Sequence, residues 1–206
     1  MVEVSVDGEE VIFEGDPPQE VGQVFDLLMG AMSERGRVLV SFLVDGVDLM
    51  ARSDEDPVPT SFDKIEAFTL THVELTLKLI ERVEEETQSL DDELVAYSRK
   101  ILFLGWSEIF SRMDEFVNKI QPVADLVDNL GPFAQTYDPP WRSAFENVRQ
   151  KQADALEEVL ACFRASDSAG LSDAVAGSFC SMLSEFRKLS AEEIKPDLRK
   201  EMKKTA

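Results

Sequence analysis

The sequence predicts an α+β fold, in which a β-rich module at residues 1–73 is followed by an α-helical bundle at residues 74–206. Two features of the 206 residues indicate this division. Apolar and polar residues alternate through much of the first part, whereas from about Thr76 onward apolar residues recur every three or four positions, as on one face of a helix. Acidic residues are also concentrated in the first part, since the range 1–75 holds 17 acidic and 4 basic residues.

The module is expected to open with a β-hairpin and a helix. Valine alternates with polar residues over 2–6, and Asp7-Gly8 is a favoured dipeptide for a tight hairpin turn. Asp16-Pro17 predicts the start of a helix, because aspartate is a good N-cap residue and proline fits the first helical position. The helix would carry an apolar stripe over 21–32, and Gly36 is expected to end it.

Three further strands are expected in the module. The apolar range 38–44 predicts a strand in the centre of a sheet, and Asp45-Gly46 predicts the turn into a short strand at 47–49. The range 51–61, with its prolines and consecutive acids, predicts a loop. A β-rich run at 68–73 predicts the last strand.

This order of hairpin, helix, strand, turn, short strand, acidic loop and final strand resembles the β-grasp fold of ubiquitin-like domains. The resemblance rests on the ranges 2–6, 21–32, 44–49 and 68–73 and covers about 75 of the 206 residues. It implies a compact protein-interaction module. Conjugated ubiquitin-like proteins and sulfur carriers end in an exposed Gly-Gly tail, whereas here the last strand runs on into 74–77, so neither covalent tagging nor sulfur transfer is expected.

The remaining residues predict four or more antiparallel helices joined by short connections. A long helical segment is expected from Leu94 to Ile120, with a weak point at Gly105. The sequence leaves open whether the apolar residues of this segment are buried within the chain or between two copies, so a homo-oligomer through the long helices is one expectation. Pro122 predicts a kink or a new helix, and Pro132 predicts the end of that helix.

Three aromatic residues are the candidate partner-binding residues. A loop is expected at 132–140, where it carries Phe133 and Tyr137, and Trp141 lies in a helix expected from 139 to about 164. Exposed aromatic side chains on a proline-rich loop are good anchors for a partner protein. The alternative is that the three rings close the open end of the helical bundle.

The net charge is −20, from 41 acidic and 21 basic residues. Such a field repels phosphate backbones and anionic lipid head groups, so neither a nucleic acid nor a membrane is expected as a partner. No secretory signal is expected, and no apolar run approaches the ~20 residues of a membrane-spanning helix, so the predicted location is cytoplasmic. The range 187–206 carries a net charge of +3 and is expected either to dock on the acidic module, in the same or a neighbouring chain, or to form a solvated helix end.

No catalytic, cofactor-binding or metal-binding residue is predicted. His72 is the only histidine, and its place in the sequence gives it no partners for a catalytic triad or a di-iron site. Asp45-x-x-Asp48 and the acidic run 54–56 lack the glycine and distal glutamate of a calcium-binding loop and are expected to be solvated. Cys162 and Cys180 are expected to be free, buried thiols, because their helices offset them by roughly 9 Å along the bundle.

These observations predict a non-enzymatic protein-interaction protein that acts as an adaptor or regulator and binds a protein partner. One alternative is a chaperone whose amphipathic helices hold an export substrate while acidic charge keeps the complex in solution. The other alternative is an enzyme with a dispersed carboxylate site.

Overall fold

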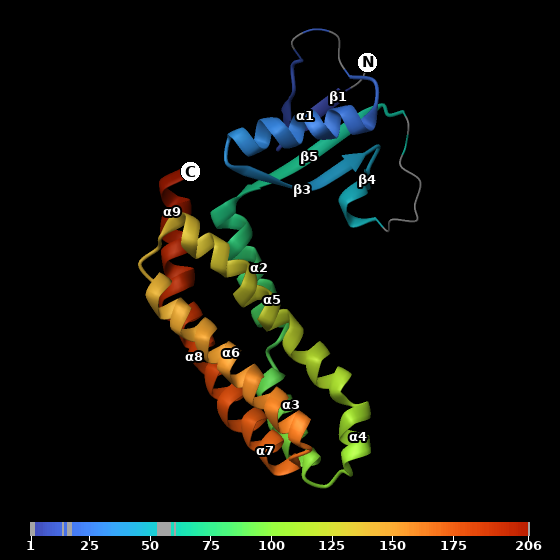
Figure 1. Cartoon of the computed structure of the whole chain (residues 1–206). Coiled ribbons are helices and arrows are strands. Elements are labelled where there is room, and N and C mark those ends of the chain that lie inside the picture. Colours follow the sequence, from blue (N-terminus) through green and yellow to red (C-terminus); the bar gives the residue numbers. More distant parts are fainter. Residues whose placement is uncertain (1–2, 14, 16–17, 53–58, 60, 206) are drawn as a thin grey trace. The chain divides into compact units, whose positions relative to one another are not determined.

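The computed structural model describes residues 3–13, 15, 18–52, 59 and 61–205. The chain divides into two compact units, Met1–Leu75 and Thr76–Ala206. A five-stranded mixed sheet is followed by a series of helices, so the α+β prediction is confirmed (Figure 1).

The N-terminal unit is a mixed sheet with one long helix. The strand order is β2-β1-β5-β3-β4, with β1 parallel to β5 and the other neighbours antiparallel. This arrangement is compatible with a β-grasp-like module. Its elements are β1 (Glu3–Val6), β2 (Glu9–Glu10), α1 (Val21–Glu34), β3 (Arg37–Val44), β4 (Val47–Asp48), the 3₁₀ turn η1 (Leu49–Ala51) and β5 (Lys64–Thr71).

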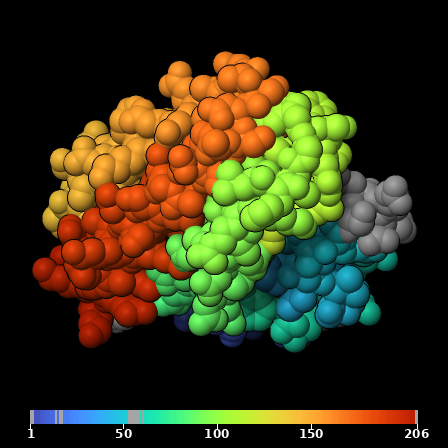
Figure 2. Space-filling model, turned by 90° about the horizontal axis from the view of Figure 1, so that it is seen from below, coloured from blue at the N-terminus to red at the C-terminus, as the bar shows by residue number. Residues whose placement is uncertain are grey.

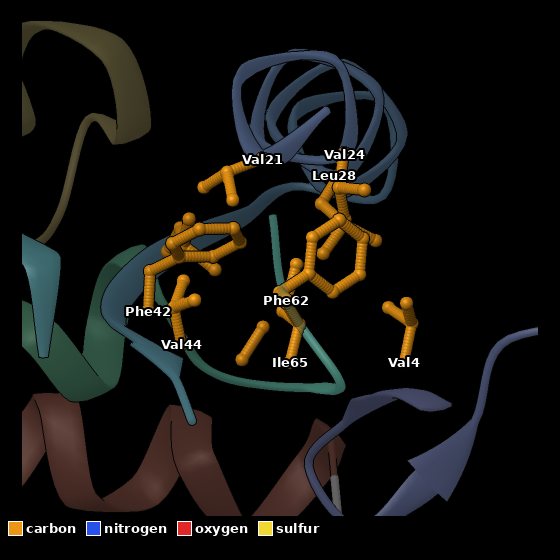
Figure 3. Packing of buried hydrophobic residues seen from close by; sticks show 10 residues of the cluster. Val4, Val21, Val24, Leu28, Phe42, Val44, Phe62 and Ile65 are labelled. Carbon is orange, nitrogen blue, oxygen red and sulfur yellow. The ribbon is translucent and has the colours of Figure 1, made fainter. Parts of the chain in front are cut away.

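The core of this unit lies between α1 and the sheet (Figure 3). Three strands contribute a row of neighbouring buried residues, Val4, Ile65 and Val44, which pair in register across the sheet. The helix packs Val24 and Leu28 onto this layer, at the four-residue spacing of one helical face. Each fully buried aliphatic side chain contributes about 1.5–3 kcal/mol, so this layer is the main stabilising contact of the unit.

Both Asp-Gly dipeptides form the expected hairpin turns. Asp7 and Gly8 have φ angles of 51° and 86°, and Asp45 and Gly46 have φ angles of 50° and 84°. Two consecutive left-handed residues match the right-handed twist of the flanking strands. The expected helix start at Asp16-Pro17 lies outside the described residues.

Asp7 also fastens the first hairpin to the centre of the sheet. Its carboxylate accepts hydrogen bonds from the backbone N–H of Thr69 at 2.8 Å and from the Thr69 hydroxyl at 2.6 Å. Arg37 donates from Nε to Thr69 Oγ1 at 2.6 Å and pairs with Asp7 at 3.2 Å. Burial alone would raise the pKa of Asp7, but the hydrogen bonds from Thr69 and the charge of Arg37 outweigh it and lower the pKa.

Asp7→Asn is expected to lower the free energy of unfolding of the N-terminal unit at pH 7 by about 1 kcal/mol, a value that allows for the partial exposure of the carboxylate. Asparagine tolerates the left-handed turn, so the losses are the charge and one of the two acceptor oxygens that bind Thr69 and Arg37. Because folding lowers the pKa of Asp7, its stabilisation is complete above the ordinary value of 3.8 and is lost as the pH falls through the folded-state pKa. Urea denaturation should therefore show a difference in the free energy of unfolding between the two proteins that is smaller at acidic pH than at pH 7. An equal difference at both pH values would contradict this account.

The last strand ends earlier than its sequence indicates. β5 ends at Thr71, and α2 (His72–Glu86) begins at the next residue, so the strand predicted over 68–73 is wrong at its C-terminal end. Thr71 and Glu74 form a reciprocal capping box: the Glu74 carboxylate accepts from the Thr71 N–H at 2.8 Å, and Thr71 Oγ1 accepts from the Glu74 N–H at 3.2 Å. This capping favours the start of a helix at His72 over the continuation of the strand through His72 and Val73. His72 therefore starts a helix.

The helical unit is built from helices that run antiparallel along much of their length (Figure 1). The range Leu94 to Ile120, expected as one segment, is divided among three helices, with Gly105 at the N-cap of the second. After α2, the helices are α3 (Leu90–Ile101), α4 (Trp106–Ser111), α5 (Met113–Tyr137), α6 (Arg142–Ala165), α7 (Ser168–Asp173), the π-helical segment η2 (Ala174–Phe179), α8 (Cys180–Leu189), the π-helical segment η3 (Ser190–Ile194) and α9 (Lys195–Thr205).

The helix α5 continues through both prolines. The predictions of a new helix at Pro122 and of a helix end at Pro132 are wrong, because α5 extends to Tyr137 and ends at Asp138 in the left-handed conformation. An interior proline costs about 3 kcal/mol or more. Here that cost is offset by a buried stripe on the same helix, at about 1.5–3 kcal/mol for each large side chain. The stripe consists of Phe116, Ile120, Val123, Leu126, Val127 and Leu130.

The basic C-terminal segment packs within the helical unit. Arg187 pairs with Asp91 on α3, and Lys195 pairs with Glu84 on α2. Arg199 pairs with Glu81 on α2 at 2.8 Å. Lys204 pairs with Glu201 within α9, so the acidic partners that the structure gives to this segment lie on α2, on α3 and in the segment itself.

Candidate functional site

The three predicted partner-binding residues form one packed cluster at the α5–α6 turn. Phe133 lies 4.6 Å from Tyr137 and stacks on Trp141 at 6.2 Å between ring centroids. Trp141 is 1% exposed, and its indole Nε1 donates to Asp197 at 3.1 Å. Phe133 and Tyr137 lie in α5, so the loop predicted at 132–140 is wrong over most of its length. The Trp141 ring is buried beneath the α5–α6 turn. Tyr137, with 50% of its surface exposed, is the most exposed of the three residues.

A second group of aromatic residues is far more exposed. Phe103 is 88% exposed, Phe110 is 64% exposed and Leu102 is 54% exposed. We call the surface formed by Leu102, Phe103, Trp106, Phe110 and Phe163 the aromatic end. Figure 2 shows this end of the helical unit, where green residues of α3 and α4 adjoin orange residues of α6 and α7.

Local geometry explains why these rings face outward. α3 ends at Ile101, which is buried, and the chain turns through Leu102 and Phe103 to Gly105, the N-cap of α4. In α4 the neighbouring residues Ile109 and Phe110 point about 100° apart, as successive helical residues do. Ile109 is 1% exposed, so Phe110 is left at the surface.

One of the exposed rings, Phe110, is held from behind. Phe163, near the end of α6, stacks on Phe110 with ring centroids 5.5 Å apart and lies 5.1 Å from Trp106. Aromatic contacts of this kind contribute about 0.5–1.5 kcal/mol each beyond the area they bury. The aromatic end is therefore a supported surface on two helices. The sequence pattern did not predict it, although the run from Leu102 to Trp106 is rich in apolar residues around a helix-breaking glycine.

Two of the larger hollows on the described surface lie elsewhere. One, of about 740 Å³, lies between the β1–β2 hairpin and α1, and its lining includes Ile12, Leu28 and Arg35. The other, of about 430 Å³, lies between α2 and α5, and its lining includes Leu79 and Pro122. Each combines apolar side chains with separate charged groups.

The acidic pair Asp45 and Asp48 has a structural role. Asp45 accepts from the backbone N–H of Lys64 at 2.8 Å, which ties the β3–β4 turn to β5. Asp48 accepts from the Ser41 hydroxyl at 2.8 Å and from the Met50 N–H at 2.9 Å. Burial would raise the pKa of Asp48, but these hydrogen bonds lower it overall. The run 54–56 lies outside the described residues.

The described residues contain no cluster of histidine, cysteine, aspartate or glutamate that could hold a metal ion.

Hydrogen bonds from Lys119 and Ser89 lower the pKa of Glu93. A carboxyl that acts as a general acid near neutral pH needs a raised pKa instead. The arrangement around Glu93 therefore suits an ion pair.

Both cysteines are free, partly buried thiols. Burial is the first cause that raises the pKa of each thiol, and nearby acids add to it, Asp167 for Cys162 and Asp91 for Cys180. The thiolate is the reactive form, so both side chains are poor nucleophiles at neutral pH.

Both thiols are expected to react with a soluble disulfide reagent more slowly in the folded protein than in the unfolded protein at pH 7. The folded-state rate should increase as the pH rises above the ordinary thiol pKa of 9.0, because deprotonation is delayed to higher pH. Absorbance of the released reagent thiol measures both rates, and Cys162→Ser and Cys180→Ser assign them. A folded-state rate at pH 7 that equals the unfolded rate would show that neither thiol is protected.

Comparison with models of protein families, with curated proteins and with solved structures gives no match to this chain. In the described part of the chain, no helix combines the length and the apolar character that crossing a membrane requires.

Proposed function

We propose that this chain is a non-enzymatic protein-interaction protein, an adaptor or regulator, and that the aromatic end is its partner-binding surface. The observation that carries the proposal is the exposure of Phe103 and Phe110, at 88% and 64%, on a supported end of the helical unit. Large aromatic side chains are normally buried, and exposed groups of them mark interaction sites.

The energetics favour this surface over the predicted α5–α6 cluster. Burying a phenylalanine against a partner contributes about 1.5–3 kcal/mol, and few such anchors carry most of the affinity of an interface. Phe110 is held by its contact with Phe163, so little conformational entropy is lost when it binds. Trp141 is already buried and hydrogen-bonded to Asp197, so it has little surface left to contribute.

We also propose that the N-terminal unit is a ubiquitin-like interaction module and that the protein works in the cytoplasm. Support for the module comes from the strand order β2-β1-β5-β3-β4 and from the packing of α1 on one face of the sheet. Its excess of acidic residues would favour partners with basic surfaces.

The double substitution Phe103→Ser/Phe110→Ser is expected to abolish or weaken at least tenfold the capture of partner proteins by the tagged full-length chain, because both anchors are removed. The fold should persist, since both side chains are exposed. Affinity capture from native lysate with quantitative mass spectrometry measures the change.

Leu79→Ser is the matched control, because Leu79 is an exposed apolar residue on α2, outside the aromatic end. Circular dichroism should show native helix content in both variants. Partners retained by the double variant but lost from the Leu79 variant would contradict the proposed surface.

A further inference from the structure

The aromatic end carries charges of both signs beside its apolar centre. Arg99 and Lys100 lie in the last turn of α3, and Arg164 lies in the last turn of α6. Asp114 and Glu115 lie in the first turn of α5. Within the described part of the chain, none of these five side chains takes part in an ion pair, whereas most other arginines of the helical unit do.

Ring contacts place these turns at the same end. Tyr97, one turn before the end of α3, stacks on Phe116 at 5.7 Å, which holds the first turn of α5 against α3. The charge of Glu115 is close enough to Tyr97 to raise the pKa of its hydroxyl, after the larger effect of burial. Phe163 contacts Trp106 and so places the last turn of α6 beside α4.

Resting on the proposed function, we propose that the aromatic end binds the same end of a second copy of this chain around a two-fold axis. In such an isologous contact, the two sets of exposed rings meet at the axis. The cations on the α3 side of one copy then face the acids on the α5 side of the other. Figure 1 shows the first turn of α5 and α4 on one side of this end and α3, α6 and α7 on the other.

Charge favours a second copy over other occupants. The whole chain carries −20, but of the five charges beside the aromatic end three are basic and two are acidic, so two copies repel each other less here than across a surface of the chain's average charge. An anionic lipid surface would attract Arg99 and Lys100 but would repel Asp114 and Glu115. A second copy is complementary to both pairs.

The salt dependence follows from the same charges. Two chains of −20 repel each other over distances that salt screens, with a Debye length of about 30 Å at 0.01 M and about 8 Å at 0.15 M. Salt also screens the contacts between the cations and the acids across the axis, but exposed ion pairs of this kind contribute little, and burial of the apolar centre is not weakened by salt. Self-association is therefore expected to strengthen between these two ionic strengths.

Analytical ultracentrifugation of the full-length chain tests the proposal. The chain should form a dimer at concentrations up to about 100 µM, a range that detects weak self-association. Arg99→Glu/Lys100→Glu and Asp114→Lys/Glu115→Lys should each raise the dimer dissociation constant by roughly tenfold, because each variant places like charges opposite each other twice. Leu79→Ser should dimerise like the unchanged protein.

An equal mixture of the two charge variants provides the decisive readout. In a mixed dimer, the acids introduced on α3 of one copy face the lysines introduced on α5 of the other, and the second contact joins unchanged residues of opposite charge. Association should therefore return to within about threefold of the unchanged protein. A variant that simply misfolded would not be rescued by mixing. Phe103→Ser/Phe110→Ser should remain monomeric in every mixture.

A monomeric unchanged protein at the highest concentration would overturn the inference, as would a mixture that shows no rescue. Binding to phosphatidylserine vesicles without self-association would do the same and would assign the surface to lipid. If the chain is monomeric but Phe103 and Phe110 are still required to capture another protein, the inference fails and the proposed function stands. If Phe103→Ser/Phe110→Ser changes neither dimerisation nor the capture of other proteins, both the inferred dimer and the proposed partner-binding surface are wrong.

Discussion

The parallel pairing of β1 with β5 is the contact on which the N-terminal unit depends. It joins the first strand of the unit to the last, and because parallel neighbours need a crossover connection, the chain between them must cross one face of the sheet. The helix α1 makes this return and covers the buried row formed by Val4, Ile65 and Val44. The Thr69 hydroxyl on β5 accepts from Arg37 and donates to Asp7, so one buried group links β3, β5 and the first hairpin.

The helical unit depends on a different constraint, which is the burial of one long apolar stripe on α5. That stripe keeps the helix continuous through Pro122 and Pro132 and sets its first turn against α3 through Phe116. The connection between α3 and α5 is filled by the short helix α4. Because Ile109 takes the inward position of α4, Phe110 and Phe103 are left at the surface.

Packing thus separates two kinds of aromatic residue in the same unit. At the α5–α6 turn, Trp141 is buried and its one polar group is satisfied by Asp197, so this group stabilises the fold. At the aromatic end, Phe110 is packed against Phe163 on one face and is exposed on the other, and Phe103 is exposed almost completely. The charges beside them distinguish this surface further, since they lie in the last turns of α3 and α6 and the first turn of α5, where their signs also suit the helix dipoles.

The sequence by itself determined the α+β class, both Asp-Gly turns and the apolar stripe of α1, because these depend on local conformational preference and on a regular period. The sequence also indicates where β5 ends, because Thr71 and Glu74 have the spacing of a capping box at the start of a helix. Only the tertiary structure decided that α5 passes through its prolines, because the energy that offsets them comes from residues distant in sequence. The tertiary structure also decided which aromatic residues are exposed. Both Trp141 and Phe103 are aromatic residues near the end of a helix, and their burial depends on which other helices pack against them.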